Sequence, residues 1–343
     1  MGDMRRVLVT GGAGYIGSHT AKALARAGHV PVVFDNLSNG HAEAVRWGPL
    51  IIGDVRDPAA VEACMRDHAI DSVIHFAGLI EVGRSVVEPD VFWDVNLNGV
   101  ASVLRAMRAC DVERLVFSST AAVYGQPDVP SLACLPETLP PLPINPYGDS
   151  KLAAERLIAA HARAYGLKGV ALRYFNACGA DPEGEIGEAH QPESHLIPLA
   201  IEAALGLGPA LTVFGQDFPT PDGSCIRDYI HVADLAEAHV LALHADAGSD
   251  GFAAINLGLG QGRSVLQVIQ AVSGAVGRPT PFGMGERRIG DPACLVADAG
   301  RARTLLGWRP VFTDLDEIVS TAVAWRRQPV FGDRLLTTER QVA

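Results

Sequence analysis

The sequence contains little lysine and has no excess of basic charge. Only three of its 28 basic residues are lysines, at positions 22, 151 and 168, and 39 acidic residues bring the formal net charge to −11. Proteins that bind nucleic acids or anionic membrane surfaces through charge carry basic patches instead. We therefore expect neither a nucleic acid nor a membrane among the partners of this chain.

The chain also lacks long apolar runs and closely paired cysteines. No run approaches the ~18 apolar residues that a membrane span needs, and no apolar signal segment follows the charged start. Without a C-x-x-C pair, the cysteines are expected to be free, buried thiols in a reducing compartment. These features predict a cytoplasmic protein. The six cysteines are Cys64, Cys110, Cys134, Cys178, Cys225 and Cys294.

Short β-branched runs alternate with helical stretches over the first half of the chain. The whole sequence has 48% hydrophobic and 20% charged residues. This composition excludes a disordered chain, and the alternation predicts a parallel sheet with helices on both faces. We predict an α/β fold, a Rossmann-type doubly wound parallel sheet with a smaller mixed α/β C-terminal substrate domain. The expected strands are Val7–Thr10, Val30–Asp35, Leu50–Gly53, Ser72–Phe76, Leu115–Ser118 and Gly169–Tyr174. The expected helices are His19–Ala27, Pro58–His68, Asp90–Cys110 and Tyr147–Tyr165.

The pattern changes near residue 176, where Gly and Pro begin to interrupt the chain. We predict a Rossmann domain over residues 1–176, a domain over 177–330 that mainly binds substrate, and a tail over 331–343. The stretch Asp228–His244 is expected to form a helix that rejoins the first sheet. Part of 228–260 would then return to the first domain.

A glycine-rich loop, Gly11-Gly12-Ala13-Gly14-Tyr15-Ile16-Gly17, lies between the first expected strand and the first expected helix. Gly11 allows a tight turn, Gly14 lets a pyrophosphate approach the helix N-terminus, and Gly17 permits close packing of helix on strand. Asp35 ends the second strand, 21 residues after Gly14. A carboxylate there accepts hydrogen bonds from the adenosine ribose and repels a 2′-phosphate, so the sequence predicts NAD in preference to NADP.

Tyr147 and Lys151 are one helical turn apart and face the same side of the expected helix. A phenol of pKa about 10 is a poor base at neutral pH, but a nearby ammonium and the positive nicotinamide ring favour the phenolate. Thr120, after Ser118 and Ser119, lies at the carboxyl edge of the sheet, where α/β proteins bind ligands. We predict Tyr147 as the catalytic base, Lys151 as its charged partner and Thr120 as the hydroxyl that bonds the reacting oxygen.

The Gly-x-x-Gly-x-x-Gly spacing and the later Tyr-x-x-x-Lys pair together resemble the extended short-chain dehydrogenase/reductase family. Its cofactor-lining motifs recur, since Asp54-Val55 matches the pair beside adenine, Phe76-Ala77-Gly78 follows the fourth strand, and Asn96 lies on the next helix. The resemblance implies these cofactor-binding residues: Gly11, Gly14, Tyr15, Ile16, Gly17, Asp35, Asn36, Leu37, Ser38, Asn39, Gly40, Asp54, Val55, Phe76, Ala77, Gly78, Leu79, Ile80, Asn96, Ser118, Tyr147, Lys151, Tyr174 and Phe175.

Within that family the chain is most similar to the UDP-glucose 4-epimerases. The stretches that carry this likeness are Thr10–Thr20, Phe76–Leu79, Ser118–Gly125, Asn145–Lys151, Leu172–Asn176 and Arg227–Val232. The resemblance implies an isomerase of galactose metabolism that interconverts UDP-glucose and UDP-galactose with bound NAD. The implied substrate-binding residues are Thr120, Tyr147, Asn176, His195, Leu196, Thr212, Val213, Phe214, Arg227, Arg288, Asp291 and Leu295.

The implied mechanism oxidises the sugar transiently at C4. Tyr147 removes the proton of the 4-hydroxyl, with Thr120 in the hydrogen bond, and the hydride passes to NAD⁺. The keto sugar then turns over while its UDP tethers it, and the hydride returns to the other face. Arginine suits the pyrophosphate better than lysine because its guanidinium is planar and always charged.

Four positions depart from commoner members of the family. Ile80 stands where a lysine often touches the cofactor, so one contact is lost, and Thr120 replaces the usual serine. His195 stands where an asparagine often contacts the nucleotide. Leu295 stands at the position that screens sugar size, where a large aromatic implies rejection of N-acetyl sugars and a small residue implies acceptance. Leucine is intermediate and leaves N-acetyl activity open.

Several alternatives follow from the same motifs. A sugar-nucleotide dehydratase needs an acidic pair after the threonine, where this chain has Ala121 and Ala122. A UDP-pentose epimerase, acting on UDP-xylose or UDP-arabinose, or a UDP-N-acetylhexosamine epimerase needs the same catalytic groups and stays open. A non-catalytic NAD-sensing regulator has no need to retain the tyrosine, lysine and threonine together.

Two further expectations concern metals and assembly. The loop residues Glu188, His190, Glu193 and His195 fit no standard ligand spacing, so we predict no metal site. The helices expected at Asp90–Cys110 and Tyr147–Tyr165 resemble those that pair in epimerase homodimers, and we predict a homodimer. Apolar residues on the first of these helices suit either that interface or the core of a monomer: Val91, Val95, Val100, Val103, Leu104 and Met107.

Overall fold

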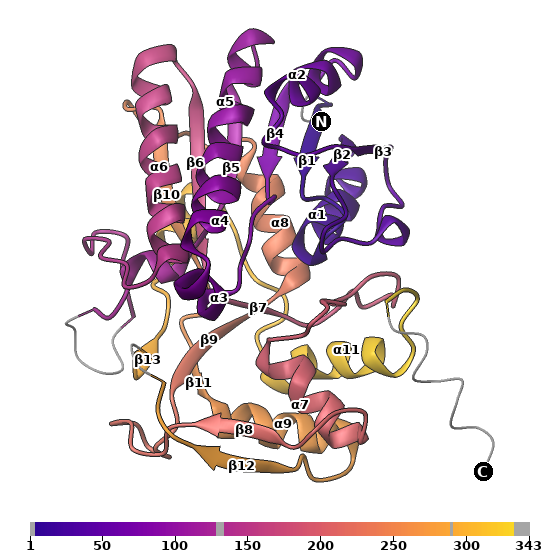
Figure 1. Ribbon diagram of the computed structural model, residues 1–343, viewed down its shortest axis with the longest axis vertical. Helices are drawn as coiled ribbons and strands as arrows, with labels where there is room; N and C mark the ends of the chain where they lie inside the picture. The colour runs from indigo at the N-terminus through magenta and orange to yellow at the C-terminus, as the bar shows by residue number, and fades with distance from the viewer. Residues whose placement is uncertain (1–3, 128–133, 289–290, 333–343) are drawn as a thin grey trace.

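A sheet of seven parallel strands forms one half of the molecule (Figure 1). The computed structural model describes residues 4–127, 134–288 and 291–332. The strand order is β10-β6-β5-β4-β1-β2-β3, so the order reverses between β1 and β4, as in doubly wound nucleotide-binding sheets. The strands are β1 Arg6–Thr10, β2 Val30–Asp35, β3 Leu50–Ile52, β4 Ser72–His75, β5 Arg114–Thr120, β6 Lys168–Tyr174 and β10 Phe252–Leu257.

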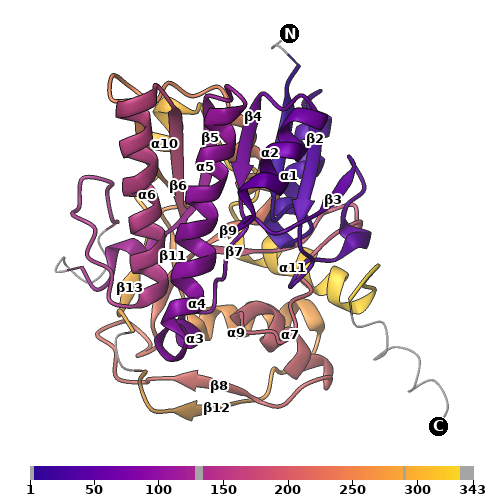
Figure 2. The same ribbon diagram turned by 45° about the horizontal axis from the view of Figure 1, so that its top comes forward.

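Helices cover both faces of this sheet, because its strands carry apolar side chains on both sides (Figure 2). One core, which includes Phe34 and Leu104, joins the sheet to α2, α5 and α6. The other core, which includes Leu24 and Trp308, joins it to α1, α8 and α10. The helices of this half are α1 Tyr15–Arg26, α2 Pro58–Asp67, α3 Val82–Val87, α4 Pro89–Trp93, α5 Gly99–Ala109, α6 Pro146–Tyr165, α8 Val232–Ala242 and α10 Gly300–Leu305.

A smaller half of short strands and helices lies below the carboxyl edge of the sheet (Figure 1). Strand β9 is central to it, since it pairs with β7 and β13 in parallel and with β11 in antiparallel fashion. A third apolar core joins α7, α9 and α11. The elements are β7 Asn176–Cys178, α7 Leu196–Leu205, β8 Leu211–Phe214, β9 Ile226–His231, β11 Gly262–Ser264, α9 Val265–Val276, β12 Phe282–Gly285, β13 Cys294–Leu295 and α11 Leu315–Arg327.

The predicted fold class is confirmed, with differences at particular elements. The helix predicted over Asp228–His244 is wrong at its start, because residues 228–231 belong to β9 and the helix begins at Val232. Backbone pairing with β7 and β11 holds these residues extended. The helix predicted over Asp90–Cys110 contains a π-helical segment at Asp94–Asn98 between α4 and α5.

The cysteine prediction is correct in pairing and partly wrong in burial. All six cysteines are free, but Cys134 is exposed, and Cys110 and Cys294 are only half-buried. Within the described ranges no helix is both long and apolar enough to cross a membrane. Residues 333–343 of the predicted tail lie outside the described residues, whereas Phe331 at its start is buried beside Trp325.

Candidate active site

The glycine-rich loop leaves β1 at the point where the strand order reverses, beside the end of β4. Gly11 has a φ of +71°, and a Cβ there would lie 2.6 Å from the backbone nitrogen of Ala77. A Cβ on Gly17 would lie 2.2 Å from the carbonyl oxygen of Gly11. The loop therefore needs glycine at both positions, one for its turn and one for close packing of α1.

Gly14 has a different environment, which leaves room for a ligand. A Cβ there would meet one atom, the Gly11 carbonyl oxygen, at 3.3 Å. Gly14 is also the N-cap of α1, and no side chain caps this end of the helix. The first N–H groups of α1 and the helix dipole are thus available to an anion such as a pyrophosphate.

Asp35 lies at the end of β2 next to this loop and is buried. Its carboxylate accepts hydrogen bonds from the backbone N–H groups of Ala13 at 3.0 Å and Leu37 at 2.8 Å. Burial raises the pKa of Asp35, while these two bonds act in the opposite direction. A carboxylate has more lone pairs than these bonds occupy, so Asp35 retains acceptor capacity for ribose hydroxyls.

Residues that follow β2 and β3 lie next to Asp35 at the carboxyl edge of the sheet. The side chain of Asn36 donates to the Asp54 carboxylate at 3.2 Å and accepts from the Ser38 N–H at 3.0 Å. Arg56 binds the same carboxylate through its side chain and lowers the pKa of Asp54. Val55 is buried in the core beneath. Sequence reasoning named Asp54 and Asn36 but missed the Arg56 contact.

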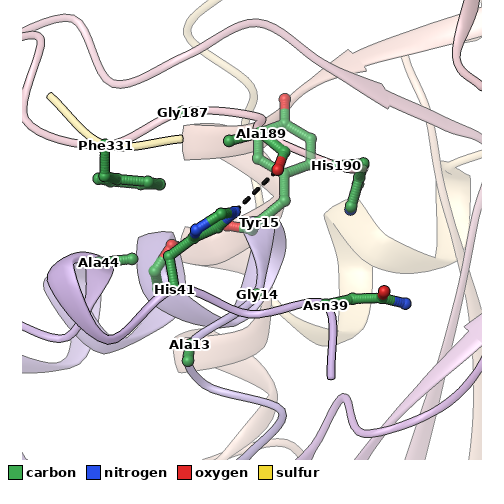
Figure 3. A pocket seen from close by; sticks show the side chains of 11 residues that line it. Ala13, Gly14, Tyr15, Asn39, His41, Ala44, Gly187, Ala189, His190 and Phe331 are labelled. Carbon is green, nitrogen blue, oxygen red and sulfur yellow. Dashed lines mark hydrogen bonds between the residues drawn. The ribbon is translucent and has the colours of Figure 1, made fainter. Parts of the chain in front are cut away.

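The second half of the molecule covers the glycine-rich loop. Ala13, Gly14 and Tyr15 line a small pocket with Asn39 and His41, and Gly187, Ala189, His190 and Phe331 close it from the other side (Figure 3). The Nε2 atom of His41 lies 2.8 Å from the Ala189 carbonyl oxygen, and the Tyr15 hydroxyl donates to the Gly179 carbonyl oxygen at 2.6 Å. The predicted cofactor residues thus lie at a junction between the two halves.

The segment after β4 is fixed by one buried amide. Asn96, in the π-helical segment, accepts from the Leu79 N–H at 2.8 Å and donates to the Leu79 carbonyl at 3.1 Å. It also donates to the Ser150 hydroxyl at 3.1 Å. A Cβ on Gly78 would lie 2.9 Å from Asn96 Oδ1 and 3.3 Å from Lys151 Nζ. Gly78 and Leu79 therefore lie against the tyrosine–lysine helix, while Phe76 packs beside His239 of α8 and Ile80 is more exposed.

Helix α6 presents Tyr147 and Lys151 to the end of β5. Pro146 occupies its first turn, and the Asn145 side chain caps it by accepting from the Gly148 N–H at 2.9 Å. Tyr147 is 8% exposed and lies beside the Thr120 side chain. Burial raises the pKa of Tyr147, and the Thr120 hydroxyl lowers it in part. The three predicted catalytic residues are therefore brought together.

Lys151 is almost fully buried and donates to the Ser118 carbonyl oxygen at 2.9 Å. Burial lowers the pKa of Lys151 to about 8, and the charge of Glu155 acts in the opposite direction. His75 on β4 stays neutral beside it, because burial lowers the pKa of that imidazole to about 3. On β6, Tyr174 is hydrogen-bonded to the Ser118 hydroxyl, and Phe175 is buried just after it.

The predicted substrate residues gather around β9, β13 and the loop before β13. Arg227 Nη2 lies 3.3 Å from the Asp291 carboxylate, and its Nη1 donates to the Pro292 carbonyl at 2.9 Å. Leu295 pairs with Arg227 in register and packs near Phe175. Leu295 therefore lies between the expected nucleotide residues and the catalytic end of the sheet.

A second group of substrate residues lies on the β8–β12 ribbon. Arg288 stacks on the ring of Phe214, with 3.9 Å from its guanidinium carbon to the ring centroid. Thr212 and Val213 precede Phe214 on β8. Asn176 begins β7, which pairs with β9 opposite Tyr229. Of the two arginines predicted for the pyrophosphate, Arg227 thus lies on β9 and Arg288 in the loop after β12.

His195 is the N-cap residue of α7, immediately before Leu196, and lies in a cluster of ionisable groups. Its Nδ1 atom lies 2.5 Å from buried Glu188, and His190 lies 3.0 Å from the same oxygen. Burial alone would lower the pKa of His195, but the charges of Glu188 and Glu193 raise it to about 9. Glu188 thus contacts both His190 and His195, and the sequence spacing did not indicate these contacts.

Sequence reasoning missed a buried ion pair behind the catalytic residues, formed by Glu155 of α6 and Arg173 of β6. The signal that could have found it is the spacing, since Glu155 follows Lys151 by one helical turn. Both residues are under 10% exposed, although charged side chains are rarely buried unless paired.

Comparison with known proteins agrees with this geometry. A sequence model of the NAD dependent epimerase/dehydratase family matches residues 7–258. A UDP-glucose 4-epimerase of Rhizobium leguminosarum bv. trifolii is 50% identical over 93% of this chain and 96% of its own length.

Solved structures give the same result. The Brucella ovis UDP-glucose 4-epimerase in complex with NAD is 49% identical over 93% of this chain and 98% of its own, with a TM-score of 0.88. The Bifidobacterium longum enzyme, in complex with NAD⁺ and UDP, is 37% identical over 94% of this chain and 98% of its own, with a TM-score of 0.89. The chain therefore belongs to the NAD dependent epimerase/dehydratase family and groups with its UDP-glucose 4-epimerases.

Proposed function

We propose that the chain is an NAD-dependent 4-epimerase of UDP-hexoses that interconverts UDP-glucose and UDP-galactose. The observation that carries the proposal is the convergence of Thr120, Tyr147 and Lys151 at the carboxyl edge of the sheet, beside the uncapped N-terminus of α1. The family assignment and the names of the relatives support it.

The described residues fit NAD. The open space at Gly14 and the N–H groups of α1 suit the pyrophosphate, and Asp35 suits the adenosine ribose. Lys151 has three N–H donors and uses one on Ser118, so it has donors left for the nicotinamide ribose. When bound, NAD accepts the hydride from sugar C4 and returns it.

The chain's own residues handle the proton and hold the sugar. Tyr147, as phenolate, removes the proton of the 4-hydroxyl and later gives it back, while Thr120 bonds the same oxygen. The charge of Lys151, one helical turn away, stabilises the phenolate, because a nearby opposite charge favours the ionised form. Residues around Tyr147 exclude water from this proton transfer, since the phenol is 8% exposed.

The UDP group is assigned to the second half. Arg227 and Arg288 bind the diphosphate, and Asn176, His195, Leu196, Asp291 and the β8 residues hold the rest. This anchor lets the keto sugar turn over without leaving, so that both faces of C4 meet the cofactor. Ala121 and Ala122 follow Thr120, without an acidic group for elimination of water, which disfavours a dehydratase.

The proposal is tested by incubating the purified chain, with and without added NAD, with UDP-galactose and measuring UDP-glucose. Conversion is expected. An NAD-sensing regulator would bind NAD without any turnover, and that result would end the proposal. The same assay with UDP-N-acetylhexosamines and UDP-pentoses measures which sugars are converted by a site that has leucine at position 295.

We also propose a homodimer formed through the surface of α3, α4 and the adjacent α6. Of the six apolar residues considered on Asp90–Cys110, four are buried in the core of the monomer, so they carry no interface: Val100, Val103, Leu104 and Met107. Exposed apolar side chains lie instead on α3 and α4, namely Val86, Val87, Val91 and Trp93. Apolar side chains gathered on one surface favour association.

Light scattering checks the dimer, since each chain contributes 36.2 kDa. We expect twice that mass for the natural chain and a single-chain mass for Val91→Glu. Val311→Glu, at a still more exposed valine elsewhere, is the control and should stay dimeric. A single-chain mass for the natural protein would overturn the dimer. The cytoplasmic location and the domain boundaries remain proposals, supported by the free cysteines and the sheet topology.

A further inference from the structure

A row of three ionisable side chains, Tyr147, Lys151 and Glu155, follows one face of α6 at intervals of one turn. The first two have catalytic roles in the proposed function. Glu155 has no role in that function, yet its side chain is almost completely buried, with 3% of it exposed. A carboxylate is costly to remove from water, so its burial in this row requires an explanation.

Glu155 is held by groups from both neighbouring strands. Arg173 of β6 binds it as a fork, with Nε 2.9 Å from Oε1 and Nη2 2.6 Å from Oε2. The hydroxyl of Ser119 on β5 donates to the same carboxylate. Arg173 also donates to the Tyr124 hydroxyl at 3.1 Å, which in turn donates to Asn256 of β10 at 2.7 Å.

These partners lie at one level of the sheet. Ser119 pairs with Arg173 across β5 and β6, and Asn256 pairs with Arg173 across β10 and β6. The next level toward the carboxyl edge contains Thr120 and Tyr174. Glu155 therefore fastens α6 to the strands one residue before the catalytic threonine.

The fastening fixes a distance on which catalysis depends. Tyr147 and Thr120 come from different elements, and both can reach the same substrate oxygen only if α6 and β5 keep one relative position. A buried ion pair adds little net stability, because the loss of hydration offsets the attraction. Its geometry, in contrast, allows only one arrangement of the two elements, since the fork and the hydroxyl bond are directional.

The charge of Glu155 has a second effect, on Lys151. The ionisable groups that face Lys151 are His75 from β4 and Tyr147 and Glu155 from α6, and His75 is neutral. Burial lowers the pKa of Lys151, and Glu155 is the group that opposes this shift. An uncharged lysine would no longer stabilise the Tyr147 phenolate.

We propose that Glu155 is a positioning residue of the active site, which locks α6 onto β5 and β6 through Arg173 and Ser119 and keeps Lys151 in the place and charge state that Tyr147 needs. The inference rests on the proposed function for the roles of Tyr147 and Lys151. It adds a buried residue that does not itself touch substrate or cofactor.

The test is Glu155→Gln, which keeps size and removes charge, with kcat and KM for UDP-galactose measured against pH. We expect kcat to fall between about tenfold and a hundredfold with KM little changed, because the nucleotide residues are remote. We also expect the alkaline limb of the kcat profile to move down by about one pH unit, since Lys151 loses its proton sooner. A profile that superimposes on that of the natural chain would overturn the proposal.

Two variants separate the parts of this effect. Ser119→Ala removes one bond and no charge, so it should lower kcat without moving the alkaline limb; an unchanged kcat would contradict the positioning role. Glu62→Gln on α2 removes a glutamate from an exposed ion pair with Arg66 and is the matched control, with no expected change.

If Glu155→Gln does not fold, Glu155→Gln/Arg173→Met removes both buried charges and leaves neither unpaired. The same downward shift is expected for that double variant, and its absence would overturn the proposal.

A second measurement is independent of turnover. The ionisation of Lys151 is followed by ¹⁵N NMR of the chain labelled at its three lysines, with Lys151→Met to identify the signal. In Glu155→Gln the Lys151 ammonium should lose its proton at lower pH than in the natural chain, because the opposing negative charge is gone, and an unchanged titration would contradict the proposal. If the natural chain epimerises no UDP-sugar, the proposed function fails while this titration still decides the role of Glu155.

Discussion

At the scale of single residues, burial changes what Tyr147 and Lys151 can do. Burial raises the pKa of Tyr147, which alone would make it a weaker source of phenolate at neutral pH. Burial also lowers the pKa of Lys151 to about 8, so the ammonium remains mostly charged at pH 7. The pair therefore depends on its neighbours, Thr120 on one side and Glu155 on the other.

The role of Tyr147 gives a prediction at this scale. Tyr147→Phe removes the proton acceptor and keeps the ring, so kcat should fall by about 10²–10⁴-fold while UDP binding, measured by calorimetry, is retained. Tyr165→Phe, at an exposed tyrosine near the end of the same helix, is the matched control and should keep normal turnover. Near-normal turnover of Tyr147→Phe would contradict the assignment.

At the scale of elements, α5 illustrates how packing decides what a helix face is for. Its apolar stripe faces the sheet and packs with α2 and α6, so it belongs to the core. The amphipathic pattern alone suits both this role and a subunit interface, because both bury one face of a helix.

The core role of α5 predicts a stability effect. Leu104→Ala should lower the free energy of unfolding by about 2–5 kcal/mol, because Leu104 is 1% exposed and the site cannot collapse fully. Arg105→Ala, at the next and exposed position, should change it by less than about 0.5 kcal/mol. Urea denaturation followed by circular dichroism measures both, and equal effects would remove Leu104 from the core.

The loop before α7 predicts a dependence of stability on pH. Because the folded-state pKa of His195 is raised to about 9, its contribution is complete below pH ~6.5 and is lost as pH rises through about 9. The stability difference between the natural chain and His195→Gln, without substrate, should therefore shrink between pH 7 and pH ~10. His161→Gln is the control, since burial lowers the pKa of His161 and it is neutral over that range. A stability difference between the natural chain and His195→Gln that stays constant over this pH range would contradict a protonated His195.

At the scale of the whole molecule, the two halves are joined by buried contacts across the expected cofactor loop. Lys22 of α1 is 4% exposed and lies 2.7 Å from Asp181, 2.7 Å from Glu185 and 3.0 Å from Glu183. The hydrogen bond from Tyr15 to Gly179 crosses the same junction. NAD bound at the loop would therefore be enclosed by both halves.

This junction can be weakened at one residue. Lys22→Met leaves a buried carboxylate unpaired, so unfolding should become easier by about 3–5 kcal/mol, and retention of NAD during gel filtration should fall. Arg26→Met removes an exposed partner of Glu183 on the same helix and should cost less than about 1 kcal/mol. If the two variants behave alike, the buried pair does not hold the halves together.

The local sequence predicts those features of the protein that depend on only a few neighbouring residues. The glycine spacing, Asp35 at the end of β2 and the Tyr147–Lys151 turn all act over short distances, and the parallel sheet follows from alternating apolar runs. Asp228–His231 was expected as helix because its pairing partners, β7 and β11, are remote in the sequence. The helical spacing places Glu155 on the same face as Lys151, but it does not indicate the partners of Glu155, since Ser119 and Arg173 come from two other elements.

The sequence by itself thus determined the sheet, the cofactor loop and the identity of the reacting side chains, because chain geometry and side-chain chemistry settle these locally. Only the tertiary structure decided which charges are buried together. The Glu155–Arg173 pair and the cover over the glycine-rich loop each need different elements brought together, and the contact of Glu188 with His195 needs one loop folded back on itself. Their pKa values and positions depend on that burial, because desolvation and charge act through space.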